Sequence, residues 1–130
     1  MIEKRPSRIS GAGVFATQPI RRDTFIVEYK GEKISWAESE RREKRYLARG
    51  RIWCFKLTAR TARDAAYGGN IGRYVNHSCR PNCYSDIVGD RIWIRALRDI
   101  EPGEELTYDY CTDGEAQIRC RCRPGCRTVL

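Results

Sequence analysis

The 130-residue sequence predicts a mainly β protein of one domain with a single short helix. A chain of this length has room for one modest hydrophobic core, which is the first observation behind this prediction. The second observation is that most local signals are short runs of β-branched and aromatic residues separated by turns. The third is that only residues 35–49 combine a helix start signal, good helix formers and a stop signal.

The first expected elements are a glycine loop and a strand. Gly11 and Gly13 bracket a short loop, where the missing side chains would let the backbone approach a ligand closely. TFIVEY at residues 24–29 is rich in β-branched and aromatic residues, and the turn Lys30-Gly31-Glu32 follows it. This segment therefore predicts a strand.

The predicted helix begins after Ser35, because Ser35 and Glu38 have the spacing of a capping box. It ends before Gly50, a residue type that commonly stops helices. Glu38 and Arg42 are four residues apart, so we expect them to form an ion pair on an exposed face. Such a pair stabilises a helix by only a few tenths of a kcal/mol.

The second half of the chain predicts further strands joined by turns. Residues 84–88 and 91–97 flank Gly89-Asp90, a two-residue connection of the kind that closes β-hairpins. Pro102-Gly103 then turns the chain again before ELTYDY at residues 105–110. The sequence has no internal repeat and no clear linker, which agrees with one domain.

Charge and hydrophobicity narrow the classes of protein. The net charge is +8, and arginine is spread along the whole sequence. This balance favours an acidic partner, either nucleic acid or a protein bound to it, while the simpler alternative is a solvated basic surface. No apolar run reaches the length of about 18 residues that spans a membrane. The N-terminus MIEKRPSRIS lacks the apolar stretch of a secretory signal, so we expect an intracellular protein outside the membrane.

The seven cysteines predict a metal site. In a reducing compartment, an odd number of cysteines does not suit a disulfide framework. Three of them lie in CRCRPGC at residues 120–126, where Gly125 allows a sharp turn that would bring the three sulfurs onto one centre. A tetrahedral zinc ion needs a fourth ligand from elsewhere, for which Cys79 is the first candidate and Cys83 and Cys111 are the alternatives.

Several motifs, taken in order, point to one family. The sequence contains SGAGVFA (10–16), EYKGEKIS (28–35), DAAYGGNIGRYVNHSCRPNC (64–83), GEELTYDY (103–110) and CRCRPGC (120–126). This ordered set resembles the SET-domain protein lysine methyltransferases that carry a post-SET zinc motif. The resemblance extends from about Ser7 to Cys126, and its most specific part is NHSC followed by ELTYDY.

The resemblance implies a SET fold of several small curved sheets with one short helix and a C-terminal pseudoknot, in which the C-terminal segment threads beside the NHSC segment. It divides the chain into a SET domain, residues 1–113, and a post-SET zinc-binding tail, residues 114–130. The last cysteine follows after three residues where the family usually has four. The zinc ligands that the resemblance implies are Cys79, Cys120, Cys122 and Cys126.

The resemblance also implies that S-adenosylmethionine binds between the glycine loop, the NHSC motif and the tail. Asn76 would bind the polar end of its methionine part, and His77 would help to hold the adenine, largely through backbone groups. A general-base role for His77 is the alternative, but we expect a structural hydrogen-bonding role. Ile118 would cover the adenine. The residues expected at the cofactor are Gly11, Ala12, Gly13, Val14, Tyr74, Asn76, His77 and Ile118.

In this family the substrate lysine enters a narrow channel from the opposite face. Free lysine has a pKa near 10.4, so the channel and the neighbouring sulfonium must favour the neutral amine. Tyr110 matches the family's essential tyrosine, and Tyr108 matches the residue that lines the amine end of the channel. Phe55 would line the channel with Trp53, which stands where many members carry a tyrosine. Because the Tyr108 hydroxyl can hold a water against the amine, we expect mainly monomethyl product.

Two functions of other classes are alternatives. One is a catalytically silent SET-fold module that binds chromatin or nucleic acid, against which Tyr110, Asn76 and the glycine loop argue. The other is a small basic zinc module that binds nucleic acid directly, but no recognition helix or stacking-aromatic motif supports it. We therefore predict an S-adenosylmethionine-dependent protein lysine N-methyltransferase. Its partner would be a basic protein such as a histone or a DNA-associated protein, and we expect a monomer or dimer, nuclear in a eukaryote or cytoplasmic in a bacterium.

Overall fold

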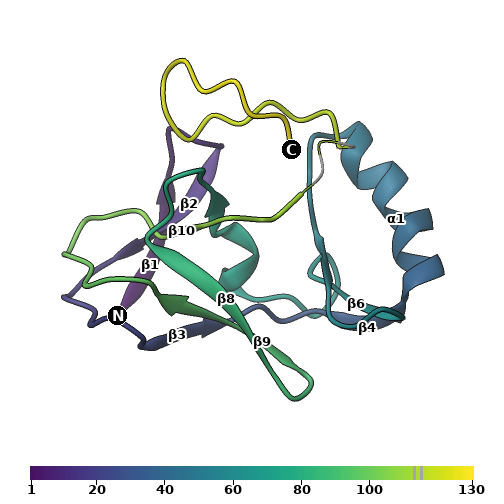
Figure 1. The fold of residues 1–130 in the computed structure, drawn as a ribbon, viewed down its shortest axis with the longest axis horizontal. Coiled ribbons are helices and arrows are strands. Elements are labelled where there is room, and N and C mark those ends of the chain that lie inside the picture. Colours follow the sequence, from purple (N-terminus) through teal and green to yellow (C-terminus); the bar gives the residue numbers. More distant parts are fainter. Residues whose placement is uncertain (113, 115) are drawn as a thin grey trace.

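The structure is a computed structural model that describes residues 1–112, 114 and 116–130. It consists mostly of short strands in small sheets, with one α-helix and one 3₁₀ turn (Figure 1). The predicted domain boundary between residues 113 and 114 adjoins residue 113, which lies outside the described part. The elements are β1 (Ile2–Pro6), β2 (Ala12–Ala16), β3 (Phe25–Glu28), β4 (Glu32–Ser35), α1 (Trp36–Ala48), β5 (Cys54–Lys56), β6 (Thr61–Asp64), η1 (Ile71–Tyr74), β7 (Asn76–His77), β8 (Cys83–Val88), β9 (Arg91–Ala96) and β10 (Thr107–Tyr108).

Two antiparallel units contain the expected strands and turns. The N-terminal hairpin pairs β1 with β2, so that Lys4 lies opposite Val14 and Arg5 opposite Gly13. The second unit is a three-stranded sheet in the order β3-β9-β8, which confirms the strand predicted at residues 24–29 and the predicted hairpin. The hairpin of β8 and β9 extends away from the rest of the molecule (Figure 1).

The helix α1 packs beside a sheet of β4, β6 and β5, and its predicted start and stop are confirmed. The Ser35 hydroxyl accepts a hydrogen bond from the Glu38 backbone N–H at 3.1 Å. The helix ends where Gly50 adopts a φ of 69°, a conformation that glycine tolerates best.

Arg42 forms the expected ion pair with Glu38 at 3.0 Å, but the expectation of an exposed face was wrong. Only 16% of the Arg42 side chain is exposed, because it reaches across to the fully buried carboxylate of Asp64 in β6, at 3.0 Å. Glu32 in β4 is a further partner of Arg42. The helix is therefore joined to the sheet by a partly buried ionic network.

The strands β7 and β10 pair in parallel, with Asn76 opposite Thr107 and His77 opposite Tyr108. Parallel neighbours cannot be joined by a tight turn, so the chain between them makes the long β8-β9 excursion before it returns. This is the contact between the NHSC segment and the C-terminal segment that the predicted pseudoknot requires. The tail after β10 then runs across one end of the molecule, drawn in yellow in Figure 1.

The main hydrophobic core lies between the N-terminal hairpin, the β3-β9-β8 sheet and the β7-β10 pair. Its fully buried side chains include Val14, Val75, Ile94, Ile100 and Leu106. A second cluster around Ile92 and Leu57 supports the β4-β6-β5 sheet, and a third forms around the cysteines of the tail. No helix of the described residues is long and apolar enough to cross a membrane.

Candidate active site and cysteine cluster

A cavity of about 650 Å³ opens where the N-terminal hairpin, the segment after α1, the η1-β7 segment and the tail meet. It collects most of the residues that the motifs predict for the cofactor and the reaction. The predicted residues that line it are Gly11, Ala12, Trp53, Tyr74, Asn76, His77, Tyr110 and Ile118. The predicted residues that do not line it are Gly13, Val14, Phe55 and Tyr108, which lie behind its wall in the core.

The orientation of the Asn76 amide is fixed by acceptors from three segments. Its Nδ2 donates to the carbonyl oxygen of Ala12 at 2.8 Å and to Glu105 Oε2 at 2.9 Å. It also lies 3.3 Å from the hydroxyl oxygen of Ser7. Among the described residues no donor reaches Asn76 Oδ1, so this oxygen is available to a donor group in the cavity.

Glu105 also explains one glycine of the loop. The Ser7 hydroxyl donates to the Glu105 carboxylate, which lies against Gly13. A Cβ added at Gly13 would collide with the same carboxylate, so a larger residue there would displace the Glu105 side chain from Ser7 and Asn76. A Cβ at Gly11, in contrast, would meet no atom within 4 Å. The close approach that the sequence predicts for a ligand is thus made by Glu105 at Gly13.

His77 is a buried, neutral hydrogen-bonding group. Its Nδ1 accepts a hydrogen bond from the backbone N–H of Tyr110 at 3.0 Å, and Nε2 lies 3.6 Å from the sulfur of Cys79. Burial lowers the pKa of His77, although Asp109, with an oxygen 3.7 Å from Nδ1, opposes this. The geometry matches the structural role that the sequence favours over a general base.

Tyr110 and Tyr108 bring their rings together at the inner end of the cavity, with centroids 4.8 Å apart. The Tyr110 hydroxyl donates to the carbonyl oxygen of Val75 at 2.7 Å. Burial, and then the charge of Glu105, raise the pKa of Tyr110 well above its usual value. Tyr110 is therefore a neutral phenol at physiological pH.

Tyr108 is only 3% exposed, yet its hydroxyl has no recorded hydrogen-bond partner among the described residues. In that part of the chain no fully buried side-chain oxygen or nitrogen lacks a partner. The Tyr108 hydroxyl is therefore not sealed by a protein partner from the described part of the chain. Burial raises the pKa of Tyr108 as well, so the hydroxyl is a neutral donor and acceptor.

Trp53 and Phe55 approach these tyrosines from the segment that leads into β5. The ring of Phe55 stacks against Tyr108 with centroids 6.2 Å apart, and it also contacts Tyr29. The Tyr29 hydroxyl donates to the backbone carbonyl of Trp53 at 2.7 Å. The Trp53 ring meets Tyr74 edge-on at 6.3 Å, so Trp53 faces the cavity while Phe55 faces the tyrosines.

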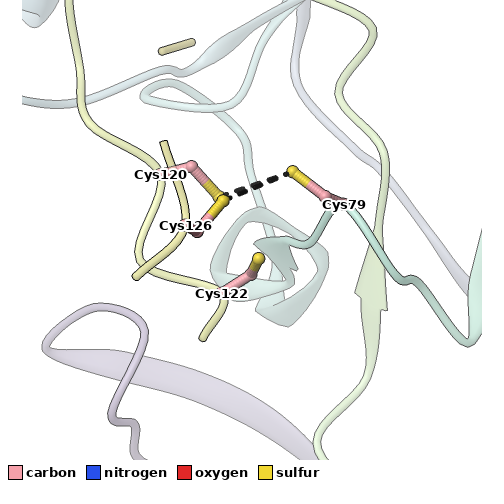
Figure 2. A group of neighbouring side chains, drawn as sticks. All are labelled: Cys79, Cys120, Cys122 and Cys126. Atoms are coloured by element: carbon pink, nitrogen blue, oxygen red, sulfur yellow. Dashed lines mark hydrogen bonds between the residues drawn. The ribbon is translucent and has the colours of Figure 1, made fainter. Parts of the chain in front are cut away.

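Four cysteines converge from two distant parts of the chain (Figure 2). The sulfur of Cys79 lies 3.8 Å from those of Cys120 and Cys126, and all four sulfurs, including that of Cys122, lie within 4.8 Å of one another. A tetrahedral zinc with Zn–S bonds of about 2.3 Å has sulfur–sulfur edges of about 3.8 Å. The donor set and spacing therefore fit zinc, and the short final spacing brings Cys126 into the group.

The alternative ligands Cys83 and Cys111 lie outside this cluster. Cys83 is 1% exposed in the main core, and burial raises the pKa of its thiol to about 12. Cys111 is exposed, and its sulfur contacts the carbonyl oxygen of Asp109. The structure thus places Cys79 beside the three cysteines of the tail.

The sequence motifs did not predict several of the residues that line or support the cavity. Lys4, Arg51, Arg73, Arg119 and Arg121 also line the cavity and make its rim basic. Ser7 and Glu105, which orient Asn76, come from opposite ends of the chain. Of these residues, Arg73, Glu105 and Arg121 belong to motifs, and nothing in the spacing of the motifs predicts these contacts.

The fold and the cavity define a SET domain, and the family model described as "SET domain" matches residues 11–111. The chain belongs to the SET domain family. It is 43% identical over 135 residues to "Histone-lysine N-methyltransferase, H3 lysine-4 specific" of Candida albicans, in a match that covers 95% of this chain and 13% of that protein. It is 45% identical over 130 residues to "Histone-lysine N-methyltransferase trr" of Drosophila melanogaster, covering 93% of this chain and 5% of that protein. The chain thus spans only a small part of these relatives.

Among solved structures, the chain resembles a humanized mutant of the Chaetomium thermophilum Polycomb Repressive Complex 2 bound to an inhibitor. The TM-score is 0.75 at 36% sequence identity. The match covers 85% of this chain and 15% of that chain.

Proposed function

We propose that this SET domain transfers a methyl group from S-adenosylmethionine to the ε-amine of a histone lysine. The observation that carries this proposal is that Asn76, His77 and Tyr110 meet on one wall of a cavity large enough for the cofactor. The names of the relatives, which are histone-lysine methyltransferases, support a histone as the substrate. The net charge of +8 supports a substrate associated with an acidic assembly such as DNA.

The cavity would hold the cofactor with its methionine part against Asn76 and its adenine towards the tail. S-adenosylmethionine supplies, when bound, a methyl group on a sulfonium. Asn76 Oδ1, oriented by the contacts of the amide nitrogen with Ala12 and Glu105, would accept a hydrogen bond from the α-ammonium. Gly11 leaves room beside the loop, and Ile118 covers the adenine from the tail. Val14 has a fully buried side chain, so only its backbone can take part.

The substrate amine would reach the reaction centre past Trp53 and Phe55. Tyr110 lies at the inner end of the cavity as a neutral phenol whose hydrogen is engaged by Val75. The free lone pairs of its oxygen accept from the amine and orient it towards the methyl group. Removal of the amine from water between these side chains disfavours the charged ammonium, which helps to supply the neutral amine. Most of the rate comes from this positioning.

We also propose that the four-cysteine cluster binds one zinc ion. Its role is structural, because four protein thiolates fill a tetrahedral site and leave no open position for substrate. Cys120 and Ile118 both line the cavity, so a metal that orders the tail also shapes the cofactor site. The tail would then act as part of the pocket.

For the product, we propose mainly monomethyl-lysine. The Tyr108 hydroxyl lacks a hydrogen-bond partner among the described residues, so it can hold a water beside the amine. That water occupies space that a methylated amine needs when it turns for a second transfer. The histone-linked relatives favour a nuclear location if the organism is a eukaryote.

The test is a methyl-transfer assay with radiolabelled cofactor, recombinant histones and a panel of other basic proteins. Label on histone lysines, located by mass spectrometry, is the expected result. Cofactor binding without transfer to any protein would instead favour the catalytically silent module. Nucleic-acid binding in a gel-shift assay, with no cofactor binding by calorimetry, would favour the basic zinc module.

A further inference from the structure

The last part of the tail, residues 118–130, folds back on itself as a short two-stranded ribbon, which we call the tail ribbon. Arg119 lies opposite Val129 in an antiparallel bridge. In the next pair along, the Cys120 backbone N–H donates to the carbonyl oxygen of Thr128 at 2.9 Å. Side chains of extended, paired segments alternate between two faces, so the tail ribbon has an inner and an outer face.

The inner face of the tail ribbon belongs to the cysteine cluster. Ile118 and Cys120 pack into the small hydrophobic group around the cysteines. The alternate residues, Arg119 and Arg121, therefore lie on the outer face. The same register, continued by two residues, brings Arg127 opposite Arg121. All three arginines are exposed, so the fold gathers three like charges on one face.

These three cations have no counter-ion in the described part of the chain. No ion pair with a carboxylate involves Arg119, Arg121 or Arg127 among the described residues. By contrast, the basic residues that pair with a carboxylate include Lys33, Arg63, Arg95 and Arg98. Residues 116–130 contain four arginines and no aspartate or glutamate, so they carry +4 of the net charge of +8.

Only the fourth of these arginines is engaged with the cysteines. Arg123 donates to the sulfur of Cys122 at 3.3 Å and so offsets negative charge in the cluster. The three arginines of the outer face are left over. Like charges placed opposite each other on paired strands repel, and such a face attracts an anion.

The composition of the tail ribbon indicates which anion fits. Residues 116–130 contain no aromatic side chain, and single-stranded nucleic acid is held mainly by aromatic side chains that stack on its bases. Val129 is the apolar residue beside the arginines, which is too little for the apolar centre of a protein interface. Guanidinium groups bind phosphate through two parallel hydrogen bonds. The face therefore suits the outside of a nucleic-acid duplex.

We propose that the outer face of the tail ribbon binds the phosphate backbone of double-stranded DNA through Arg119, Arg121 and Arg127. This inference goes beyond the proposed function, because neither the cofactor nor a substrate lysine takes part. The arginines repel a basic substrate protein but attract the DNA to which such a protein is bound. Contacts to phosphate position a protein without reading sequence, so duplexes of unrelated sequence bind equally.

The test is fluorescence anisotropy of a labelled duplex of mixed sequence with the zinc-loaded protein, without cofactor, over a series of salt concentrations. Arg127→Gln is the main variant, because Arg127 does not line the cavity. It should bind the duplex about fivefold more weakly at physiological salt, and the fall of log affinity with log salt should become shallower by about one. Arg119→Gln, on the other strand, should give the same loss of duplex affinity. Arg127→Lys, which keeps the charge, should restore most of it.

Arg91→Gln is the matched control. Arg91 is an exposed arginine at the start of β9, beside the turn of the β8-β9 hairpin, and no ion pair with a carboxylate involves it in the described part of the chain. That turn lies at the opposite end of the molecule from the tail (Figure 1). The control removes the same charge and should keep duplex affinity within about twofold, because salt screens distant charges. Zinc content and thermal melting should show that all variants are folded.

The outcomes separate this inference from the proposed function. If Arg91→Gln and Arg127→Gln lose equal affinity, or neither loses any, the tail ribbon is not the binding face and the cofactor assignment is untouched. If polyglutamate displaces the duplex at equal charge, or a single strand binds more tightly than the duplex, the partner is of another class and the proposal is wrong. If the duplex binds as expected while no protein gains a methyl group, the tail ribbon stands and the proposed function falls.

Discussion

The Tyr110 hydroxyl donates a hydrogen bond of 2.7 Å to the carbonyl oxygen of Val75, the residue immediately before Asn76. This bond uses the one hydrogen of the phenol, so the oxygen can only accept from anything else that approaches it. The same short segment thus positions the candidate catalytic oxygen and the candidate cofactor ligand. A small shift of this segment would move both groups together.

Replacing Tyr110 by phenylalanine should abolish methyl transfer and leave cofactor affinity nearly unchanged. The ring and its packing against Tyr108 and His77 remain, while the oriented oxygen is lost. We expect a fall in kcat of at least about a hundredfold, as for the loss of one preorganised polar group in other active sites. Radiolabel transfer and calorimetric cofactor binding measure the two effects. Tyr84→Phe, which removes an exposed hydroxyl bonded to Asp23, is the control; full turnover in Tyr110→Phe would remove Tyr110 from the mechanism.

Replacing Tyr108 by phenylalanine should raise the di- and trimethyl products. The change removes the hydroxyl that would hold the water and keeps the ring that stacks on Phe55. Holding one ordered water costs at most about 2 kcal/mol of entropy, which its release returns, and about 1.4 kcal/mol already changes a rate tenfold. Mass spectrometry of a lysine peptide taken to completion gives the product distribution. Abundant trimethyl-lysine from the unmodified protein would contradict the prediction, and an unchanged monomethyl product from Tyr108→Phe would shift the control to Trp53.

Metal analysis should find one zinc ion per chain, and its removal by a chelator should weaken cofactor binding. A site built from distant segments couples metal affinity to folding of the tail. Cys79→Ser should lose both the zinc and most of the cofactor affinity. Cys111→Ser changes an exposed cysteine outside the cluster and should lose neither. If Cys79→Ser loses zinc but keeps cofactor affinity, the tail is not part of the pocket.

The ionic network under α1 predicts a large difference between two neighbouring arginines. Arg42→Ala leaves the buried carboxylate of Asp64 with the Tyr46 hydroxyl and the Ala66 backbone N–H but no cation, which should lower the free energy of unfolding by about 3 kcal/mol. Arg41 is exposed and, among the described residues, pairs only with Glu38, so Arg41→Ala should change stability by less than about 1 kcal/mol. Urea unfolding followed by circular dichroism measures both. Equal effects would show that the buried pair adds no stability.

The pH dependence should follow the substrate lysine and not Tyr110. Burial and the charge of Glu105 raise the Tyr110 pKa, so the phenol keeps its proton at all pH values below its usual pKa of about 10. The neutral fraction of a lysine with a pKa near 10.4 rises about tenfold per pH unit in this range. We therefore expect kcat/KM to rise steadily from about pH 7 to pH 9. A falling limb within that range would mean that a group with a lower pKa must stay protonated.

The elements that local chemistry determines were predictable from the sequence. The Ser35 cap, the Gly50 stop and the Gly89-Asp90 hairpin each depend on residues a few positions apart, and all three are present. The sequence did not predict strand β1, because IEKRP is charged, mostly exposed and ends in proline. Arg42 was placed on an exposed face because its partner Asp64 is 22 residues away and approaches only in the folded protein.

In the candidate site, too, contacts between residues far apart in the sequence could not be predicted. Motifs identified Asn76, His77 and Tyr110 because these residues lie in runs specific to the family. The spacing of the cysteines left three candidates for the fourth position, and only folding separates Cys79 from Cys83, whose side chain points into the core. The sequence did not predict that Lys4 lines the cavity, because its position depends on the pairing of β1 with β2.

The parallel pairing of β7 with β10 has a consequence for biosynthesis. Residues 76–77 must wait for residues 107–108, and Cys79 must wait for Cys126, before either contact can form. Contacts between such distant positions form slowly, because the conformational entropy of closing the loop between them is lost before the contact stabilises the chain. During translation the hairpins can form early. The part of the cavity wall that the tail supplies cannot form until residue 126 has left the ribosome. The cavity therefore takes its final form only late in synthesis, after both the β7-β10 pair and the tail can pack.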